Sequence, residues 1–315
     1  MTTVHFGLPK RRLAPSWLTI GSYDGVHRGH RKVLEGVLAG ARDTANGRSL
    51  LTFDPHPRCV LAPDTCPATL TTVDEKAEIL GELGVNDLVV MPFTRRLSEL
   101  TAAEFMDRLL DRVPLAGLVV GHDFALGHGR EGDRAFLEAY GAAHGFVVEV
   151  VEPFMLEGQV VSSSVVRGLL LEGNVAHASR LLGRQYSLSS FVERGTGTGS
   201  RIGFPTANFA ITPNKLVPHQ GVYAVWVDIA GHAYQGAMNI GYRPTFGENR
   251  LTVEAFILDF EGDIYHQDVR ARFVQRIRDE KKFESIDALV GQIGHDVERA
   301  RAILGRANTP APPAS

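Results

Sequence analysis

Cysteine is scarce in this sequence, with two among 315 residues, Cys59 and Cys66. Their spacing fits no zinc motif and no disulfide framework, so we interpret both as ordinary residues of a reducing compartment. The sequence also lacks any apolar run near the roughly 20 residues that span a bilayer. Its N-terminus has no apolar stretch long enough for a signal peptide. These absences predict a cytoplasmic protein.

An excess of basic residues is missing as well. Lys and Arg total 33 against 36 Asp and Glu, for a formal net charge of -3. Because affinity for nucleic-acid phosphates favours a basic face, this balance argues against a nucleic-acid partner. It leaves room for a small anionic ligand held by a few local donors. Hydrophobic residues make up 44% and charged residues 22%, which is typical of a soluble globular protein, and the length suits two domains. The sequence carries no signal of oligomeric state.

Residues 1–183 alternate short apolar runs with amphipathic segments. The runs end at Gly, Asp or Pro, as buried parallel strands do. Two amphipathic segments open with a capping box, a hydroxyl followed three residues later by a carboxylate: Thr72 with Glu75, and Thr101 with Glu104. Strands that alternate with helices predict a doubly wound α/β domain. The expected strands are residues 17–20, 49–53, 88–93, 115–120 and 146–151.

After about residue 183 the pattern changes to strand-like segments separated by Gly, Pro, Asn and Asp. This pattern predicts a small antiparallel β-barrel. We expect a C-terminal helix from Ser285 to about Leu304, with Ser285 as N-cap and Gly305 as its stop. The predicted domains are residues 1–183 and 184–306, followed by a disordered tail, 307–315. The expected barrel strands are residues 186–193, 221–229, 233–240, 252–259 and 269–277.

The most informative segment is residues 21–30, GSYDGVHRGH, between the first predicted strand and a helix. Ligands of doubly wound sheets bind where a strand's C-terminal end leads into a helix, whose free N–H groups attract anions. His27 and His30 are three residues apart, so on a helical turn both rings face the same phosphoryl group. The alternatives are a zinc pair and a capping loop with incidental histidines. The other loop residues expected to bind ATP phosphates are Gly21, Asp24, Gly25 and Gly29.

A second motif, residues 161–167, follows the last strand of the first domain and opens a helix. Its hydroxyls, Ser163 and Ser164, and its arginine, Arg167, can hold a polyphosphate together at a helix start. Arg167 would stabilise a departing pyrophosphate. The alternative is a helix N-cap followed by a surface arginine.

These two motifs together resemble the nucleotidylyltransferase family, in particular its prokaryotic FAD synthetase branch. Residues 53–57, 70–76 and 121–133 match that branch too. The resemblance implies a nucleotidylyltransferase-type, Rossmann-like domain with FMN adenylyltransferase activity. It also implies that His27, His30, Ser164 and Arg167 contact ATP phosphates, and that His56 and Asp123 share a cleft. The flavin-binding residues expected from it are Phe53, His56, Asp123 and Phe124.

The second domain opens with a glycine-rich run, residues 195–203. Alternating glycines make a mobile loop whose backbone N–H groups can wrap phosphates. Beyond it, Pro205 pre-sets a turn that presents Thr206 and Asn208, hard oxygen ligands suited to Mg²⁺ beside a nucleotide. The alternative, for this segment taken alone, is that it is only a β-hairpin turn. The residues of the run expected to bind ATP are Gly195, Gly197, Gly199, Arg201 and Gly203.

The PTAN segment with its glycine-rich loop resembles the riboflavin kinase signature, and residues 221–224, 239–247, 252–254 and 278–283 extend the match. The resemblance implies that Glu254 is the catalytic base and that Arg278 and Phe283 lie in the flavin site. The alternative for Glu254 is a polar residue on a half-exposed strand. One departure is that the loop's two usual arginine positions are Thr198 and Ser200, with the arginine displaced to Arg201.

The resemblance therefore implies two activities on one chain. ATP and riboflavin would give FMN and ADP, and ATP and FMN would then give FAD and pyrophosphate, both steps with Mg²⁺. The alternatives are an adenylyltransferase with an impaired kinase domain and a non-catalytic flavin-binding regulator.

Overall fold

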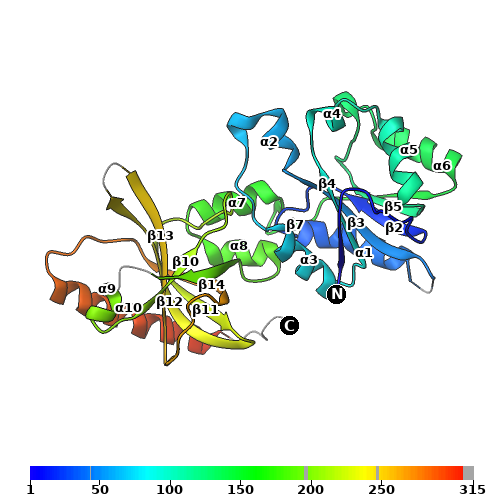
Figure 1. Ribbon diagram of the computed structural model, residues 1–315. Helices are drawn as coiled ribbons and strands as arrows, with labels where there is room; N and C mark the ends of the chain where they lie inside the picture. Colours follow the sequence, from blue (N-terminus) through cyan, green and yellow to red (C-terminus); the bar gives the residue numbers. More distant parts are fainter. Residues whose placement is uncertain (43, 195–197, 246–247, 308–315) are drawn as a thin grey trace. The chain divides into compact units, whose positions relative to one another are not determined.

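The computed structural model describes residues 1–42, 44–194, 198–245 and 248–307. The chain forms two compact units, Met1–Ser163 and Ser164–Ser315 (Figure 1). Two predicted phosphate-binding residues, Gly195 and Gly197, and the tail from residue 308 lie outside the described residues.

The first unit is built on a six-stranded sheet in which every recorded pair is parallel. The strand order is β1-β4-β3-β2-β5-β6, so the chain winds outward from β2 in one direction and later crosses to the other side. The predicted doubly wound domain is confirmed. The strands are β1 Thr3–Phe6, β2 Ser16–Ile20, β3 Gly47–Asp54, β4 Asp87–Pro92, β5 Leu115–Gly121 and β6 Val147–Val151.

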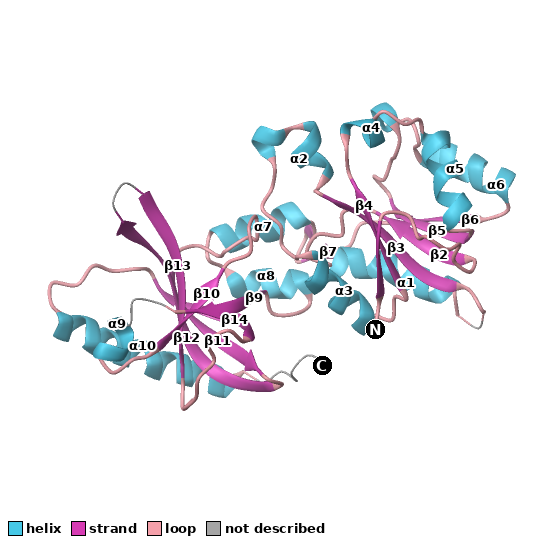
Figure 2. Ribbon diagram, viewed as in Figure 1, coloured by secondary structure: helices cyan, strands magenta, loops and turns pink. Residues whose placement is uncertain are grey.

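Helices cover both faces of this sheet (Figure 2). Successive strand residues point to opposite faces, and neighbours in β3 belong to different cores. Leu50 packs in the cluster with Leu34 of α1 and Leu80 of α3, whereas Leu51 packs with Met106 of α5. The helices are α1 Arg28–Gly40, α2 Pro57–Leu61, η1 Pro63–Thr65, α3 Val73–Glu82, α4 Arg95–Ser98, α5 Ala102–Arg112, η2 His128–Arg130 and α6 Arg134–His144, and a small hairpin is formed by β7 Met155–Leu156 and β8 Gln159–Val160.

Both predicted capping boxes are confirmed. Thr72 begins α3 and Thr101 begins α5, and in each the hydroxyl accepts from the N–H three residues on while that residue's carboxylate accepts from the cap's own N–H. Strand β1 was not expected from the sequence. It has only four residues, too few for a recognisable apolar pattern. Its strand conformation depends on parallel pairing with β4.

The interpretation of the cysteines as ordinary unpaired residues is wrong, because Cys59 and Cys66 form a disulfide. Helix α2 carries Cys59 and the short helix η1 ends just before Cys66, so two consecutive turns fold the chain back on itself. Their Cα atoms come within 4.3 Å. Pairing here depends on this local folding, which a spacing rule does not capture.

The second unit begins with two helices and continues as a closed antiparallel barrel, β10-β13-β12-β11-β14-β9, which confirms the predicted barrel. Helix α8 packs on β14, and α10 packs on β11, β12 and β14. The elements are α7 Ser163–Leu171, α8 Val175–Leu182, β9 Ser187–Glu193, α9 Thr198–Arg201, β10 Thr206–Ala210, β11 Gly221–Ile229, β12 His232–Thr245, β13 Glu248–Ile257, β14 Asp268–Arg278 and α10 Ile286–Arg306.

Two details of the second unit differ from the sequence expectation. Strand β10 was not predicted, and Thr206 and Asn208 lie on it and not in a hairpin turn. Ser285 is confirmed as the N-cap of α10, but Gly305 does not stop the helix, which continues to Arg306. A glycine ends a helix by adopting a positive φ, and Gly305 is not among the residues that do.

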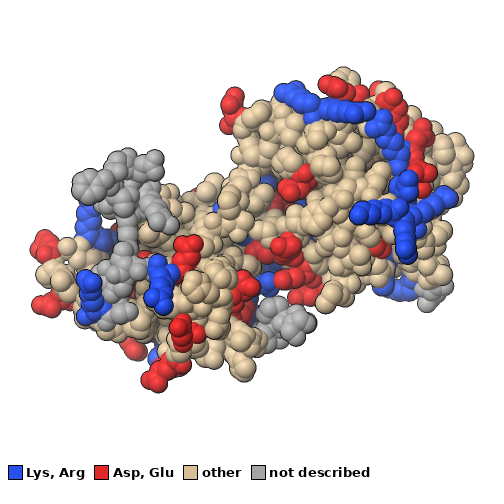
Figure 3. All heavy atoms as spheres, viewed as in Figure 1, with Lys and Arg blue, Asp and Glu red and all other residues tan. Residues whose placement is uncertain are grey.

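Charges of both signs are distributed over the face in view in Figure 3. Lys and Arg side chains gather over one side of the first unit with Asp and Glu beside them, and on the barrel the two signs are interspersed. In the described part of the chain, every helix is too short or too polar to cross a bilayer.

Candidate active sites

The loop that joins β2 to α1 lies where the strand order of the first sheet reverses. From β2 the chain proceeds to β3 on one side, while β5 lies on the other. Ligands of such sheets bind in the crevice at this reversal, beyond the C-terminal ends of the strands. The structure therefore places the predicted phosphate-binding loop at the expected position for a ligand.

His27 and His30 lie together at the start of α1, which confirms that their rings share a face. His27 is the N-cap, and its Nδ1 accepts from the His30 N–H at 3.3 Å. The rings are stacked, with centroids 3.6 Å apart, and the Tyr23 ring lies 4.6 Å from that of His30. With Nδ1 as the acceptor of this hydrogen bond, the neutral imidazole of His27 would carry its proton on Nε2.

The backbone of this loop is unusually constrained. Tyr23 and Val26 both have positive φ, 46° and 38°, a region that β-branched residues rarely enter. Val26 is fully buried, so packing holds the loop in this conformation. At Gly29 an added Cβ would meet the Val161 carbonyl at 3.1 Å, which favours glycine there. Strain of this kind is typical of functional loops.

The Asp24 carboxylate is buried and connects the loop to the segment before α3. It accepts from the backbone N–H groups of Leu70 and Thr71, at 2.9 and 3.1 Å. Its own carbonyl accepts from the Ser163 hydroxyl at 2.8 Å. These contacts indicate that Asp24 shapes the phosphate loop.

Ser164 and Arg167 lie in the first two turns of α7, as predicted. They belong to the second compact unit, whereas the histidines belong to the first. Their contacts with ATP phosphates stay predictions. Among the residues described, no group of three or more His, Cys, Asp and Glu side chains is arranged to hold a metal ion.

The predicted flavin residues of the first unit lie at or just after the ends of β3 and β5, the two strands that flank β2. Phe53 packs edge-on against Phe93, with centroids 5.4 Å apart, and His56 caps α2 through Nδ1. After β5, Phe124 packs on the core and Asp123 is 83% exposed. Both groups thus lie at the C-terminal ends of these strands, and their sharing of one cleft stays a prediction.

The second unit contains a cavity of about 280 Å³ between the outer face of the barrel and α10. Strands β10, β12 and β13 supply one wall, and the segment after β14 and the face of α10 supply the others. The lining includes five predicted site residues and two that were assigned no role from the sequence: Gly199, Thr206, Glu254, Arg278, Phe283, Asn239 and Asp296.

Strand register brings the predicted metal and catalytic residues of this unit together. Asn208 on β10 is directly opposite Glu254 on β13, and Glu254 is in turn opposite Asn239 on β12. Directly opposed residues point to the same side of a sheet, so these three polar side chains form a row across the strands. Thr206, two residues before Asn208, shares that side. The row borders the cavity.

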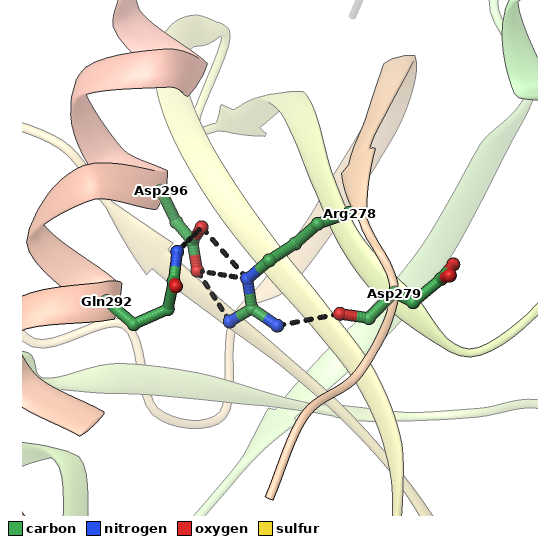
Figure 4. Close-up of polar contacts among 4 residues, drawn as sticks. All are labelled: Arg278, Asp279, Gln292 and Asp296. Carbon is green, nitrogen blue, oxygen red and sulfur yellow. Dashed lines mark hydrogen bonds and ion pairs between the residues drawn. The ribbon is translucent and has the colours of Figure 1, made fainter. Parts of the chain in front are cut away.

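Arg278 is held by a buried carboxylate on α10 (Figure 4). Its Nε donates to both oxygens of Asp296, at 2.9 and 3.0 Å, and a terminal nitrogen donates to one of them at 2.6 Å. Gln292, one helical turn before, donates to Asp296 at 2.9 Å. The other terminal nitrogen of Arg278 donates to the Asp279 carbonyl, and the guanidinium lies 5.8 Å from the Phe283 ring centroid.

The sequence reasoning missed Gln292 and Asp296. Their spacing of four residues on the predicted C-terminal helix was the available signal, because side chains at that spacing share a face.

The described end of the glycine-rich run forms the short helix α9, which includes Gly199 and Arg201. A Cβ on Gly199 would lie 2.3 Å from the Phe204 carbonyl oxygen, so only glycine fits there. Gly203 has a φ of +87°, which also favours glycine.

Comparison with known proteins assigns both units. A family model described as FAD synthetase matches residues 10–165, and one described as riboflavin kinase matches residues 182–304. The bifunctional riboflavin kinase/FMN adenylyltransferase of Pseudomonas fluorescens is 40% identical over 287 residues, 90% of this chain and 92% of that protein. The chain belongs to the bifunctional riboflavin kinase/FMN adenylyltransferase family. The family member from Escherichia coli K12 is 38% identical over 91% of this chain and 92% of its own length.

A solved structure named a macrolide-efflux protein, from Streptococcus pneumoniae, matches with a TM-score of 0.86 and 29% identity, covering 95% of this chain and 98% of that one. Its name describes another activity, whereas both family models and both relatives name flavin synthesis. Because both the riboflavin kinase model and the FAD synthetase model match the chain, neither an adenylyltransferase alone nor a non-catalytic regulator is favoured.

Proposed function

We propose that this chain converts riboflavin to FMN in its barrel unit and FMN to FAD at the β2–α1 loop, with ATP as the donor in both steps. The observation that carries this proposal is the match of two different family models to the two parts of the chain. Each part also has its own cluster of phosphate-handling residues. The substrates are small molecules, and we propose a cytoplasmic location.

In the adenylyltransferase step, a phosphate oxygen of FMN attacks the α-phosphorus of ATP, and the bond to pyrophosphate breaks. His27 and His30 donate to phosphoryl oxygens as charge grows on them. Their stacking at the start of α1 fixes both donors before the substrate arrives, which lowers the reorganisation needed. Ser164 and Arg167 hold the departing pyrophosphate.

In the kinase step, Glu254 takes the proton of the riboflavin ribityl hydroxyl as that oxygen attacks the γ-phosphorus of ATP, and ADP departs. The described glycines, Gly199 and Gly203, let the loop approach the phosphates. Each nitrogen of Arg278 already donates to Asp296 or to the Asp279 carbonyl, and its planar face lies near Phe283, so we assign that face, with Phe283, to the flavin ring.

Mg²⁺ fits the donor set of the barrel cavity. Thr206 and Asn208 share one side of β10, and their hydroxyl and carboxamide oxygens are hard ligands of the kind that Mg²⁺ prefers. These two residues would hold the ion, which would neutralise charge on the transferring phosphates.

We propose residues 1–183 as the FMN adenylyltransferase domain and residues 184–306 as the riboflavin kinase domain. The FAD synthetase model ends at residue 165 and the riboflavin kinase model starts at 182, so α7 and α8 lie mostly between the two.

A chromatographic time course with riboflavin, ATP and Mg²⁺ tests the proposal. We expect FMN first and FAD later. No product from riboflavin, with FAD formed when FMN is supplied, would refute the kinase assignment and implicate the Thr198 and Ser200 departures. The reverse pattern, FMN without FAD, would refute the assignment of the β2–α1 loop.

A further inference from the structure

Lys76 is a buried cation behind the phosphate loop. It lies on α3 and is only 6% exposed. Its Nζ donates to the Ser22 carbonyl at 2.7 Å and to the Thr52 hydroxyl at 2.9 Å. The same hydroxyl donates to the Ser22 carbonyl at 2.9 Å, so three groups meet at the C-terminal ends of β2 and β3.

The residues just before Lys76 hold the next part of the same loop. The backbone of Leu70 and Thr71 donates to Asp24, and the Thr71 hydroxyl accepts from the Gly25 N–H at 3.0 Å. Residues 70–76 therefore fix three of the loop's residues from one side, and Lys76 supplies the first of these attachments. The loop they fix leads directly into His27, the N-cap of α1.

The ammonium is an expensive group to bury at this place. Its two hydrogen-bond partners are neutral, and desolvation of a charge is costly without a close counter-ion. The charged groups that face it are Asp24, on the loop after β2, and Asp54, at the end of β3. Burial outweighs both carboxylates and lowers the pKa of Lys76 to about 8, close to neutrality. An apolar residue would fill the same space at lower cost, which points to a use for the charge.

We propose that Lys76 is a positioning residue of the FMN adenylyltransferase site, whose protonated ammonium holds the Ser22 carbonyl and thereby the loop that carries the phosphate donors. The inference rests on the proposed function of that loop. The ammonium donates to both Ser22 and Thr52 and also places a positive charge next to the phosphate loop, which a neutral amine does not. Loss of its proton weakens both effects, so the adenylyltransferase falls as pH rises through the titration of Lys76, while the kinase on the same chain does not follow it.

The test is the pH profile of kcat/KM for FMN between pH 6.5 and 9.5 in wild type and in Lys76→Met. We expect a decline in the wild type centred near pH 8, and in the variant a loss of about 100-fold at pH 7, the scale of a misplaced phosphate donor, with the decline abolished. Lys76→Arg, which stays charged, should recover part of the activity and move the decline above pH 9.

Lys32→Met is the matched control, because the Nζ of Lys32 on α1 also donates to a backbone carbonyl, that of Glu152, at 2.9 Å, in an exposed hydrogen bond. It should alter kcat/KM less than about 2-fold, as expected of an exposed polar contact. Riboflavin kinase activity, measured on each variant, reports whether the rest of the chain is folded. A Lys76→Met enzyme that keeps the wild-type pH profile, or that loses both activities together, would overturn the inference. A wild-type enzyme that makes no FAD from FMN would instead overturn the proposed function.

Discussion

Removal of the Asp296 carboxylate is expected to destabilise the barrel unit more than any ordinary surface substitution. Asp296 is 3% exposed, and the paired Arg278 side chain is 15% exposed. The carboxylate accepts three hydrogen bonds from the guanidinium and one from Gln292. Asp296→Ala leaves the guanidinium buried without its counter-ion, a change that costs about 3–5 kcal/mol of unfolding free energy.

Asp296→Asn tests the contribution of the negative charge while the size of the side chain is kept. The carboxamide keeps the volume and one acceptor oxygen but loses the negative charge, so we expect a loss of about 1.5–3 kcal/mol, the worth of a hydrogen bond to a charged group. Urea unfolding of both variants in a Trp17→Phe background, followed by the fluorescence of Trp226, reports on the barrel, because Trp226 lies in the cluster between β11 and α10. The kinase KM for riboflavin should rise in Asp296→Asn while FAD formation from FMN is unchanged.

A double-mutant cycle decides whether the two residues act as a pair. Arg278→Ala, Asp296→Ala and the double variant should give a coupling free energy of about 2 kcal/mol or more, within the range for contacting residues. A loss below about 1 kcal/mol in Asp296→Ala, or a coupling near zero, would refute the reasoning, since the carboxylate would then not be the partner that keeps Arg278 in place.

The remaining predictions concern single activities and the first unit. His30→Ala should abolish FAD formation and spare FMN formation in the chromatographic assay; survival of both activities would show that His30 has no catalytic part. Glu254→Gln should lower kinase kcat at least about 100-fold, the lower scale for general-base catalysis, with FAD formation from FMN as the control. Cys59→Ser should lower the unfolding free energy by about 2.5 kcal/mol for a loop with a sequence separation of 7 between Cys59 and Cys66, and dithiothreitol should destabilise only the wild type. The unfolding free energy should rise between pH 8 and 9.5 by about 1.6 kcal/mol more in wild type than in Lys76→Met, as measured by urea unfolding. The reason is that the unfolded chain keeps the lysine proton that the folded chain releases above a pKa of about 8.

The sequence predicts most of the fold because its signals are local. The capping hydroxyl of Thr101 and the apolar run at residues 49–53 each lie in one segment, and the structure agrees with both. Strand β10 was missed because Pro205 and the glycines before it are typical of a turn. Its strand character depends on pairing with β9 and β13, which no local pattern reports.

The candidate sites were predicted in part for the same reason. His27 and His30 are close in sequence, so their stacking follows from helical geometry. The row formed by Asn208 and Glu254 could be expected only from the family resemblance, because 46 residues and a barrel register separate the two. Asp296 had no motif to identify it, since its role depends on a partner that approaches from β14.

The packing of α7 and α8 with the barrel has a practical consequence for expression of the kinase half. In α8, Val175 and Leu182 are buried, and the carbonyl of Leu170 in α7 accepts from the His219 N–H at 2.9 Å. A fragment that starts at residue 184 would expose the β14 surface that α8 covers and should be poorly soluble. A fragment that starts at residue 164 keeps that cover and is the better choice for producing the barrel in isolation.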